Sequence, residues 1–319
     1  MKRVIYIFQS GKLSRKDNTL MLENESGNRS IPVNAVSDIN VFGEVSLNTK
    51  LLTFLSKNNI VLHFFNHYGF YVGSFYPREY YNSGLMTVLQ VQHFLDEENR
   101  LFLAKSFVLG SVLNMAKNLK DVCNDFLDDI GILESAKTIP EIMAYEGKKR
   151  ERYYSFFGDL INLEEFVFEK RTKRPPKNPL NALISFGNSL LYTTVLSEIY
   201  RTHLDPRIGY LHETNQRSFT LNLDIAEVFK PIIVDRVIFR LLNRKRITLK
   251  HFDQKTDASF LTENGMKIFV EEYEKKLSET IRYKNIGKVS YRRLIRLECY
   301  KLYKHFLGEK VYKPFTIKE

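Results

Sequence analysis

The sequence predicts an α+β protein, with a small, mostly antiparallel β domain over residues 1–80 followed by a larger all-α domain over residues 81–319. Three observations support this prediction. Short apolar runs alternate with polar turns up to about residue 80. From Met86 onward, apolar residues instead recur every three or four positions, which is the period of a helix. A chain of 319 residues is also long enough for two domains.

The first 80 residues contain the expected β elements. The polar run 23–28 includes Gly27 and predicts a hairpin turn, because glycine tolerates positive φ. Apolar positions within residues 48–57 fit one short helix. Strands are expected at residues 3–8, 19–22, 30–33, 38–43, 60–65 and 70–75.

One helix of the second half carries an acid on its apolar face. Thr138 followed by Glu141 is a capping-box pattern, and predicts a helix that begins there and continues to about residue 160. Glu146 lies four positions after Ile142, on the apolar stripe of this helix. Because carboxylates are seldom buried without a partner or a metal, Glu146 is a candidate functional residue.

Composition narrows the class of protein. The net charge of +11 and the pI near 9.4 are typical of a nucleic-acid binder, although basic membrane-surface proteins share them. No apolar run approaches the roughly 20 residues of a membrane span, and the N-terminal run reads as a strand, not a signal peptide. The two cysteines form no CxxC pair, which favours a reduced, cytoplasmic setting.

Residues 204–231 contain the strongest candidate site. His212 precedes Asp224 and Glu227, which are three positions apart and so share one face of a helix. A lone histidine is more often structural, and acids early in a helix are often solvated. The apolar neighbours of these two acids nevertheless favour at least partial enclosure.

Together with Glu146, these residues make two or three carboxylates and one imidazole, a donor set that suits Mg²⁺ or Mn²⁺ better than zinc. Such an ion would activate a phosphoryl group. Cations and a tyrosine near the acids could bind DNA phosphates and bases, although each cation could also be an ordinary solvated charge. The predicted DNA-binding residues are Lys148, Lys149, Arg150, Tyr153, Arg171, Lys173, Arg174, Arg217 and Lys230.

The order of these motifs resembles a known family, the CRISPR-associated integrases named "Cas one". The resemblance covers residues 1 to about 240 and rests on the order and spacing of several short motifs. Lys230 stands where arginine is common in the family, and Asn188 stands where tyrosine is common. The motifs are Tyr145-Glu146-Gly147, Arg174-Pro175-Pro176, Asn181-Ala182-Leu183, Ser185-Phe186-Gly187, Leu204-Asp205-Pro206, Leu211-His212 and Asp224-x-x-Glu227-x-x-Lys230-Pro231.

The resemblance implies a metal held by Glu146, His212 and Glu227, with Asp224 close by. It implies an N-terminal β domain that mediates a homodimer and a helical domain that binds double-stranded DNA. It also implies assembly with a small partner, "Cas two". The expected activity is metal-dependent cleavage and integration of DNA, in which a 3′-OH of a captured fragment attacks a phosphodiester at a repeat boundary.

Two other functions fit the same residues. One is a metal-dependent junction or repair nuclease, which would hydrolyse DNA without needing a free 3′-OH. The other is a basic DNA-binding scaffold without chemistry, whose acids would be structural.

Overall fold

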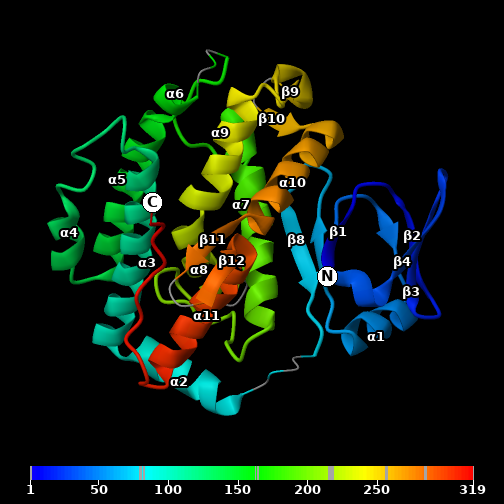
Figure 1. Ribbon diagram of the computed structural model, residues 1–319, viewed down its shortest axis with the longest axis horizontal. Coiled ribbons are helices and arrows are strands. Elements are labelled where there is room, and N and C mark those ends of the chain that lie inside the picture. Colours follow the sequence, from blue (N-terminus) through cyan, green and yellow to red (C-terminus); the bar gives the residue numbers. More distant parts are fainter. Residues whose placement is uncertain are drawn as a thin grey trace. The chain divides into compact units, whose positions relative to one another are not determined.

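The computed structural model describes residues 2–78, 81, 83–161, 163, 165–214, 219–255, 258–283 and 286–318. The chain divides into two units, Met1–Tyr80 and Tyr81–Glu319 (Figure 1). Strands and helices occur in both, so the predicted α+β class is confirmed.

The first unit consists of two four-stranded sheets and one helix. The strand order is β1-β5-β7-β8 in one sheet and β4-β3-β2-β6 in the other. A 3₁₀ turn, η1 (Val33–Ala35), leads into β5. The remaining elements are β1 (Arg3–Ile7), β2 (Gly11–Lys16), β3 (Thr19–Asn24), β4 (Gly27–Pro32), β5 (Val36–Val41), β6 (Val45–Ser46), α1 (Thr49–Lys57), β7 (Val61–Phe65) and β8 (Tyr71–Phe75).

Parallel pairing in these sheets contradicts the predicted mostly antiparallel domain. Strands β1 and β5, β5 and β7, and β2 and β6 run parallel. The antiparallel pairs are β2–β3, β3–β4 and β7–β8. Local turns signal hairpins, and those hairpins are present. Parallel pairing joins strands that are distant in sequence; the chain passes through α1, for example, between β5 and β7. It therefore leaves no turn motif in the local sequence from which it could be predicted.

The core of the first unit packs α1 against the inner faces of the strands. Asn48 caps α1 by accepting a hydrogen bond from the backbone N–H of Leu51. Leu51 and Leu55 are fully buried with Leu13, Val36 and other aliphatic residues of the sheets. Burial of each such side chain contributes about 1.5–3 kcal/mol, which explains why this short helix is stable.

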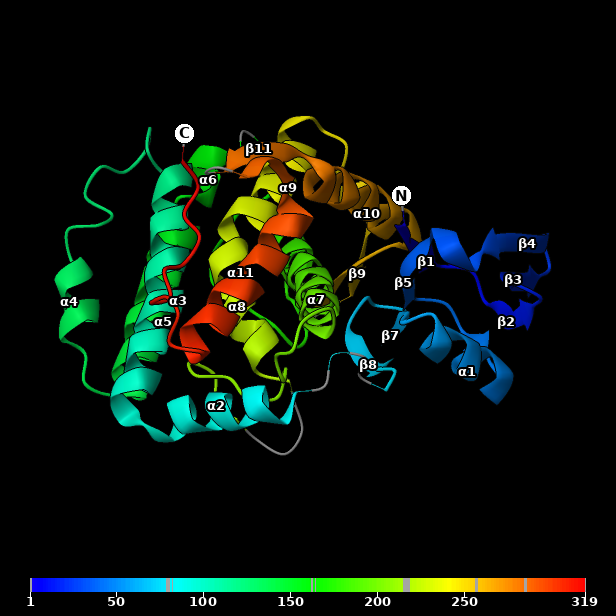
Figure 2. The same cartoon turned by 60° about the horizontal axis from the view of Figure 1, so that its bottom comes forward.

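The second unit is built around α7 (Pro179–Tyr200), which is buried on nearly all sides. Helices α8 and α11, the π-helix η2 and strand β10 pack against it (Figure 1, Figure 2). No helix in the described residues is long and apolar enough to cross a membrane. The other helices are α2 (Gly84–Leu95), α3 (Glu97–Asn118), α4 (Ile130–Ser135), α5 (Ile139–Ser155), α6 (Phe157–Leu160), α8 (Leu221–Phe229), η2 (Pro231–Asp235), α9 (Arg236–Asn243), η3 (Leu249–His251), α10 (Glu263–Ser278) and α11 (Tyr291–Phe306).

Two short hairpins show that the prediction of an all-α second domain is wrong. Strand β9 (Phe252–Lys255) pairs with β10 (Ala258–Leu261), and β11 (Thr280–Tyr283) pairs with β12 (Gly287–Ser290). Each of these strands is four residues long, which is too short for a period of two to stand out from a helical background. The hairpins precede α10 and α11, whose first turns are capped by Thr262 and Ser290.

The predicted helix start at Thr138 is confirmed. The Thr138 hydroxyl accepts a hydrogen bond from the backbone N–H of Glu141 at 3.3 Å. The Glu141 carboxylate reaches one residue further back than a capping box requires, and accepts from the backbone N–H of Lys137 at 2.7 Å. The helix ends earlier than predicted, because Phe156 interrupts it between α5 and α6.

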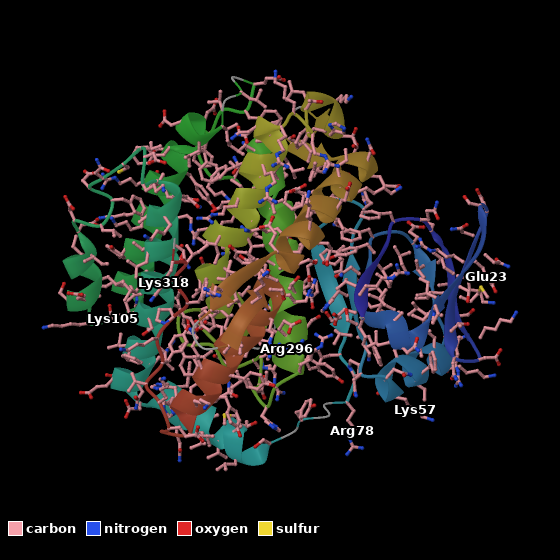
Figure 3. All side chains as sticks on the ribbon, viewed as in Figure 1. Glu23, Lys57, Arg78, Lys105, Arg296 and Lys318 are labelled. Atoms are coloured by element: carbon pink, nitrogen blue, oxygen red, sulfur yellow. The ribbon has the colours of Figure 1, made fainter. Side chains whose placement is uncertain are left out.

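Residues 309–318, here named the C-terminal strap, lie in extended form alongside α3, where Lys318 marks their end (Figure 3). The buried side chain of Asn114 in α3 donates to the carbonyls of Val228 and Phe315 and accepts from the backbone N–H of Ile317. Glu298 of α11 accepts from the backbone N–H of Phe315. The Asn114 bonds fasten the strap and the end of α8 to the same point of α3, and the Glu298 bond ties the strap to α11.

Candidate functional site

The site begins where the loop after α7 is tied to the start of α8. The carbonyl of Pro206 accepts hydrogen bonds from the backbone N–H groups of Thr220 and Leu221. The Thr220 hydroxyl accepts from Gly209 N–H at 2.9 Å and donates to the carbonyl of Arg207 at 2.8 Å. A side chain at position 209 would collide with Thr220, since its Cβ would lie 2.8 Å from the Thr220 Cβ. Glycine at 209 therefore permits this close approach.

Asp224, fully buried in α8, holds the segment that carries His212. Its Oδ2 accepts hydrogen bonds from the backbone N–H groups of Tyr210 at 2.6 Å and Leu211 at 3.1 Å. Its Oδ1 accepts from the backbone N–H of His212 at 2.9 Å and pairs with the ring Nδ1 of His212 at 2.7 Å. With four donors on its two oxygens, Asp224 fixes the position and ring orientation of His212.

The bond to Asp224 sets the tautomer of the His212 ring. Because Nδ1 donates to Asp224, the lone pair of the neutral imidazole lies on Nε2. Burial works against the charged ring, but the hydrogen bond to Asp224 and the charges of Asp224 and Glu227 outweigh it and raise the pKa of His212. A carboxylate behind a histidine is the usual arrangement for orienting a metal-binding imidazole.

Glu227, one helical turn after Asp224, is buried between two cations. Lys230 Nζ pairs with Oε1, and Arg150 Nη2 lies 2.5 Å from Oε2. Burial alone would raise the pKa of this carboxyl group, but Lys230, Arg150 and His212 lower it to about 2. Glu227 is thus negatively charged at any physiological pH.

Arg150 joins Glu146 to Glu227. One turn after Glu146 in α5, its Nε lies 3.0 Å from Glu146 Oε1, while its Nη2 contacts Glu227 and also Ser111 of α3 at 3.1 Å. The Glu146 side chain is 23% exposed, so it lies at the edge of the buried face of α5. Arg150 therefore clamps three helices together at the site and is not a free cation for DNA.

As the side chains lie, no three His, Cys, Asp or Glu residues in the described parts of the chain are close enough to hold a metal ion. The reason is that Glu146 and Glu227 face Arg150 and Lys230. The donor set itself fits Mg²⁺ or Mn²⁺, since it combines two carboxylates with one imidazole nitrogen. Asp224 adds no ligand, because four N–H groups already occupy its oxygens.

The predicted DNA-binding residues have different environments. Lys148, Lys173 and Arg174 are exposed. Arg171 is half-buried and bonds to neutral oxygens of α7. Arg217 lies outside the described residues. Lys230 is buried, and its ammonium lies 5.0 Å over the ring of Tyr192 besides pairing with Glu227.

Two predicted DNA contacts are contradicted by burial. Lys149 is 2% exposed; its ammonium pairs with Asp129 and donates to the carbonyl of Phe126. Tyr153 is fully buried, and its hydroxyl accepts from Asn118 at 2.8 Å. Both positions lie on the inward face of α5. The sequence suggests the opposite, because neighbouring basic residues are typical of a solvent-exposed face.

Asp235 is a buried acid that the sequence reasoning missed. It ends the π-helix directly after α8, and it is 1% exposed. Burial raises the pKa of Asp235 to about 7, although the charge of Arg150 works in the opposite direction. The signal available in the sequence was an acid at the end of the apolar run 231–235.

The chain is similar to known proteins in both sequence and structure. The profile of the family described as CRISPR associated protein Cas1 matches residues 5–275. A CRISPR-associated endonuclease Cas1 2 from Thermodesulfovibrio yellowstonii is 50% identical over 327 residues, which cover 99% of this chain and 99% of the relative. The structure of a CAS1 protein from Thermotoga maritima matches with a TM-score of 0.92 at 51% identity, covering 99% of this chain and 100% of that one.

These relatives place the chain in the class of CRISPR-associated endonucleases. The chain belongs to the Cas1 family, so the resemblance and the predicted class of enzyme are confirmed. Two more distant proteins share the fold alone. The first is a casposase bound to integration product, which matches with a TM-score of 0.89 at 21% identity, covering 100% of this chain and 94% of that one. The second is a chain of a Cas6-RT-Cas1–Cas2 complex, which matches with a TM-score of 0.85 at 16% identity, covering 100% of this chain and 36% of that one.

Proposed function

We propose that this protein integrates short fragments of foreign DNA into a CRISPR repeat array. In the reaction, the 3′-OH of a captured fragment attacks a phosphodiester at the repeat boundary, a new phosphodiester forms, and the original 3′-oxygen leaves. If water replaces the 3′-OH, the same site hydrolyses DNA. One observation carries the proposal: Glu146, Glu227 and an Asp224-oriented His212 belong to one partly buried charge cluster in a Cas1-family chain.

Glu146, Glu227 and the Nε2 of His212 are the groups that would hold Mg²⁺ or Mn²⁺. A bound ion of this kind supplies Lewis-acid stabilisation of the charge that develops on the phosphoryl oxygens. Asp224 keeps the lone pair of His212 on Nε2. Arg150 and Lys230 balance the two glutamates, and would have to loosen those ion pairs when a metal binds.

The basic surface and the family support the proposed partners. A net charge of +11 favours binding of double-stranded DNA. The first unit would mediate a homodimer, and the dimer would assemble with the small CRISPR-associated protein Cas2. A Cas1-like chain occurs in the Cas6-RT-Cas1–Cas2 complex, although that similarity concerns the fold alone. Such an assembly would act on DNA in the cytoplasm.

Alanine substitution of the three proposed ligands tests the function. With Mn²⁺ present, Glu146→Ala, His212→Ala and Glu227→Ala should each abolish strand transfer while DNA binding persists. Glu151→Ala is the matched control, because Glu151 lies in the same helix as Glu146 but is exposed. A wild-type rate in any of the three ligand variants would overturn the assignment.

A further inference from the structure

Arg171 is a half-buried cation that bonds to neutral oxygen atoms. Its Nη1 donates to Asn181 Oδ1 at 3.0 Å and to the carbonyl of Thr172, and its Nη2 donates to Ser185 Oγ at 2.9 Å. Among the described residues, no carboxylate lies within ion-pair distance of it. A guanidinium remains charged in a protein, so no described side chain compensates this positive charge. Enclosing a charge without an opposite charge is unfavourable, which suggests that an anionic ligand completes the arrangement.

The face of α7 places Arg171 beside the catalytic carboxylates. Ser185 and Tyr192 lie seven positions apart, so they share one face and are separated by about 10 Å along the helix axis. Arg171 is bonded to Ser185, and the ammonium of Lys230 lies over Tyr192 at 5.0 Å while it pairs with Glu227. The uncompensated charge therefore lies on the order of 10 Å from Glu227 along α7.

Lys173 adds a second cation to this face. Loss of water around its ammonium, together with the positive charges of Lys230 and Arg171, lowers the pKa of Lys173, and Glu146 and Glu227 act on it in the opposite sense. Lys173 is exposed and stands two residues after Arg171, in the loop that Arg171 joins to α7. It too has no carboxylate within ion-pair distance in the described parts of the chain. Among the described residues, Arg171 and Lys173 are therefore two cations of one loop without a paired carboxylate.

We infer that Arg171, assisted by Lys173, binds a backbone phosphate of the DNA strand next to the phosphodiester that is attacked. The inference deepens the proposed function and rests on it for the identity of the ligand. A phosphate suits Arg171 because its planar guanidinium can offer two parallel N–H donors. With about 3.4 Å of rise per nucleotide in one strand, the phosphate lies within about three nucleotides of the attacked bond.

Neutralising one phosphate at a time tests this inference. The probe is a branched DNA that mimics the strand-transfer product, with a single methylphosphonate at each of three positions on either side of the junction. Affinity is measured without metal, so that chemistry does not contribute. For the wild type, one position should cost at least about tenfold in affinity, since a hydrogen bond to a charged group contributes about that much. In Arg171→Met, the same position should cost little.

Lys173→Met provides a second variant that does not depend on the bonds between Arg171 and α7, and should reduce the loss at the same or a neighbouring position. Lys177→Met is the matched control, because Lys177 is an exposed cation of the same loop. The positional pattern of this variant should remain that of the wild type. The inference is overturned if Arg171→Met and Lys173→Met both keep the full wild-type pattern, in which case Arg171 only anchors its loop to α7. Strand transfer by the wild type, measured separately, tests the proposed function and can fail without affecting this result.

Discussion

Replacing Asp224 with asparagine should strongly destabilise the second unit. The two carboxylate oxygens of Asp224 accept four N–H bonds, two on each oxygen. If the NH₂ group replaces Oδ2, it faces two backbone donors and both of their bonds are lost. If it replaces Oδ1, the backbone bond of His212 is lost, and so is the charge-assisted bond to the ring, which can then only accept from the amide after moving its proton to Nε2. At about 1.5–3 kcal/mol for each bond to a charged group, the loss is about 3–6 kcal/mol. That is a large share of the roughly 5–15 kcal/mol that stabilises an ordinary domain.

Urea unfolding in the absence of metal measures this loss. The control is Glu213→Gln, the same carboxylate-to-amide change at an exposed position next to His212, which should leave the midpoint unchanged. Loss of the Asp224 contact should also lower the pKa of His212, which a histidine NMR titration detects. If Asp224→Asn unfolds within about 1 kcal/mol of the wild type, Asp224 does not hold the His212 segment as argued.

Three further substitutions test the contacts of individual residues. The pKa of Glu227 falls from 4.5 to about 2 on folding, so ionised Glu227 stabilises the fold by on the order of 3 kcal/mol above pH 4.5, and this stabilisation is lost as the pH falls toward 2. The free energies of urea unfolding of Glu227→Gln and of the wild type should therefore converge in acid. A difference that stays constant with pH would contradict the ion pairs. Asn114→Leu breaks three buried hydrogen bonds and should lower the free energy of unfolding by at least about 3 kcal/mol. The C-terminal strap should also become open to carboxypeptidase digestion. Continued protection of the strap would show that Asn114 does not fasten it. Gly187→Ala places a Cβ 2.5 Å from Val234 Cγ1, so overpacking should lower the free energy of unfolding by about 1–3 kcal/mol, despite the better helix propensity of alanine. Tm should fall accordingly, and a rise in Tm would refute this.

The parts of the fold that local patterns encode were predictable from the sequence. The strand near the N-terminus, the hairpin of β7 and β8, and the helix capped by Thr138 all rest on periodicity, turn chemistry and capping over a few residues. The parallel pairing of β1, β5 and β7 depends instead on contacts between distant segments. The hairpins before α10 and α11 were missed because their strands are too short to carry a period.

The candidate site shows the same division. Spacing and apolar neighbours pointed to Asp224 and Glu227, and a helical stripe pointed to Glu146. Sequence spacing could not tell which basic residues of α5 face inward. Lys149 and Arg150 both stand in a basic run, but Lys149 is buried against Phe126 and Arg150 links the two glutamates. Such partners come from other helices, so only the packed structure separates these roles.

The most direct test of the central claim compares donor DNA that ends in a free 3′-OH with the same DNA blocked at the 3′ end. With Mn²⁺ or Mg²⁺, the wild-type protein should join the first donor to a repeat-containing target and should fail to join the second. The product should disappear in Glu146→Ala and persist in Glu151→Ala. Cleavage of the target at equal rates with both donors, with no joined product, would contradict integration and would instead indicate a hydrolytic nuclease.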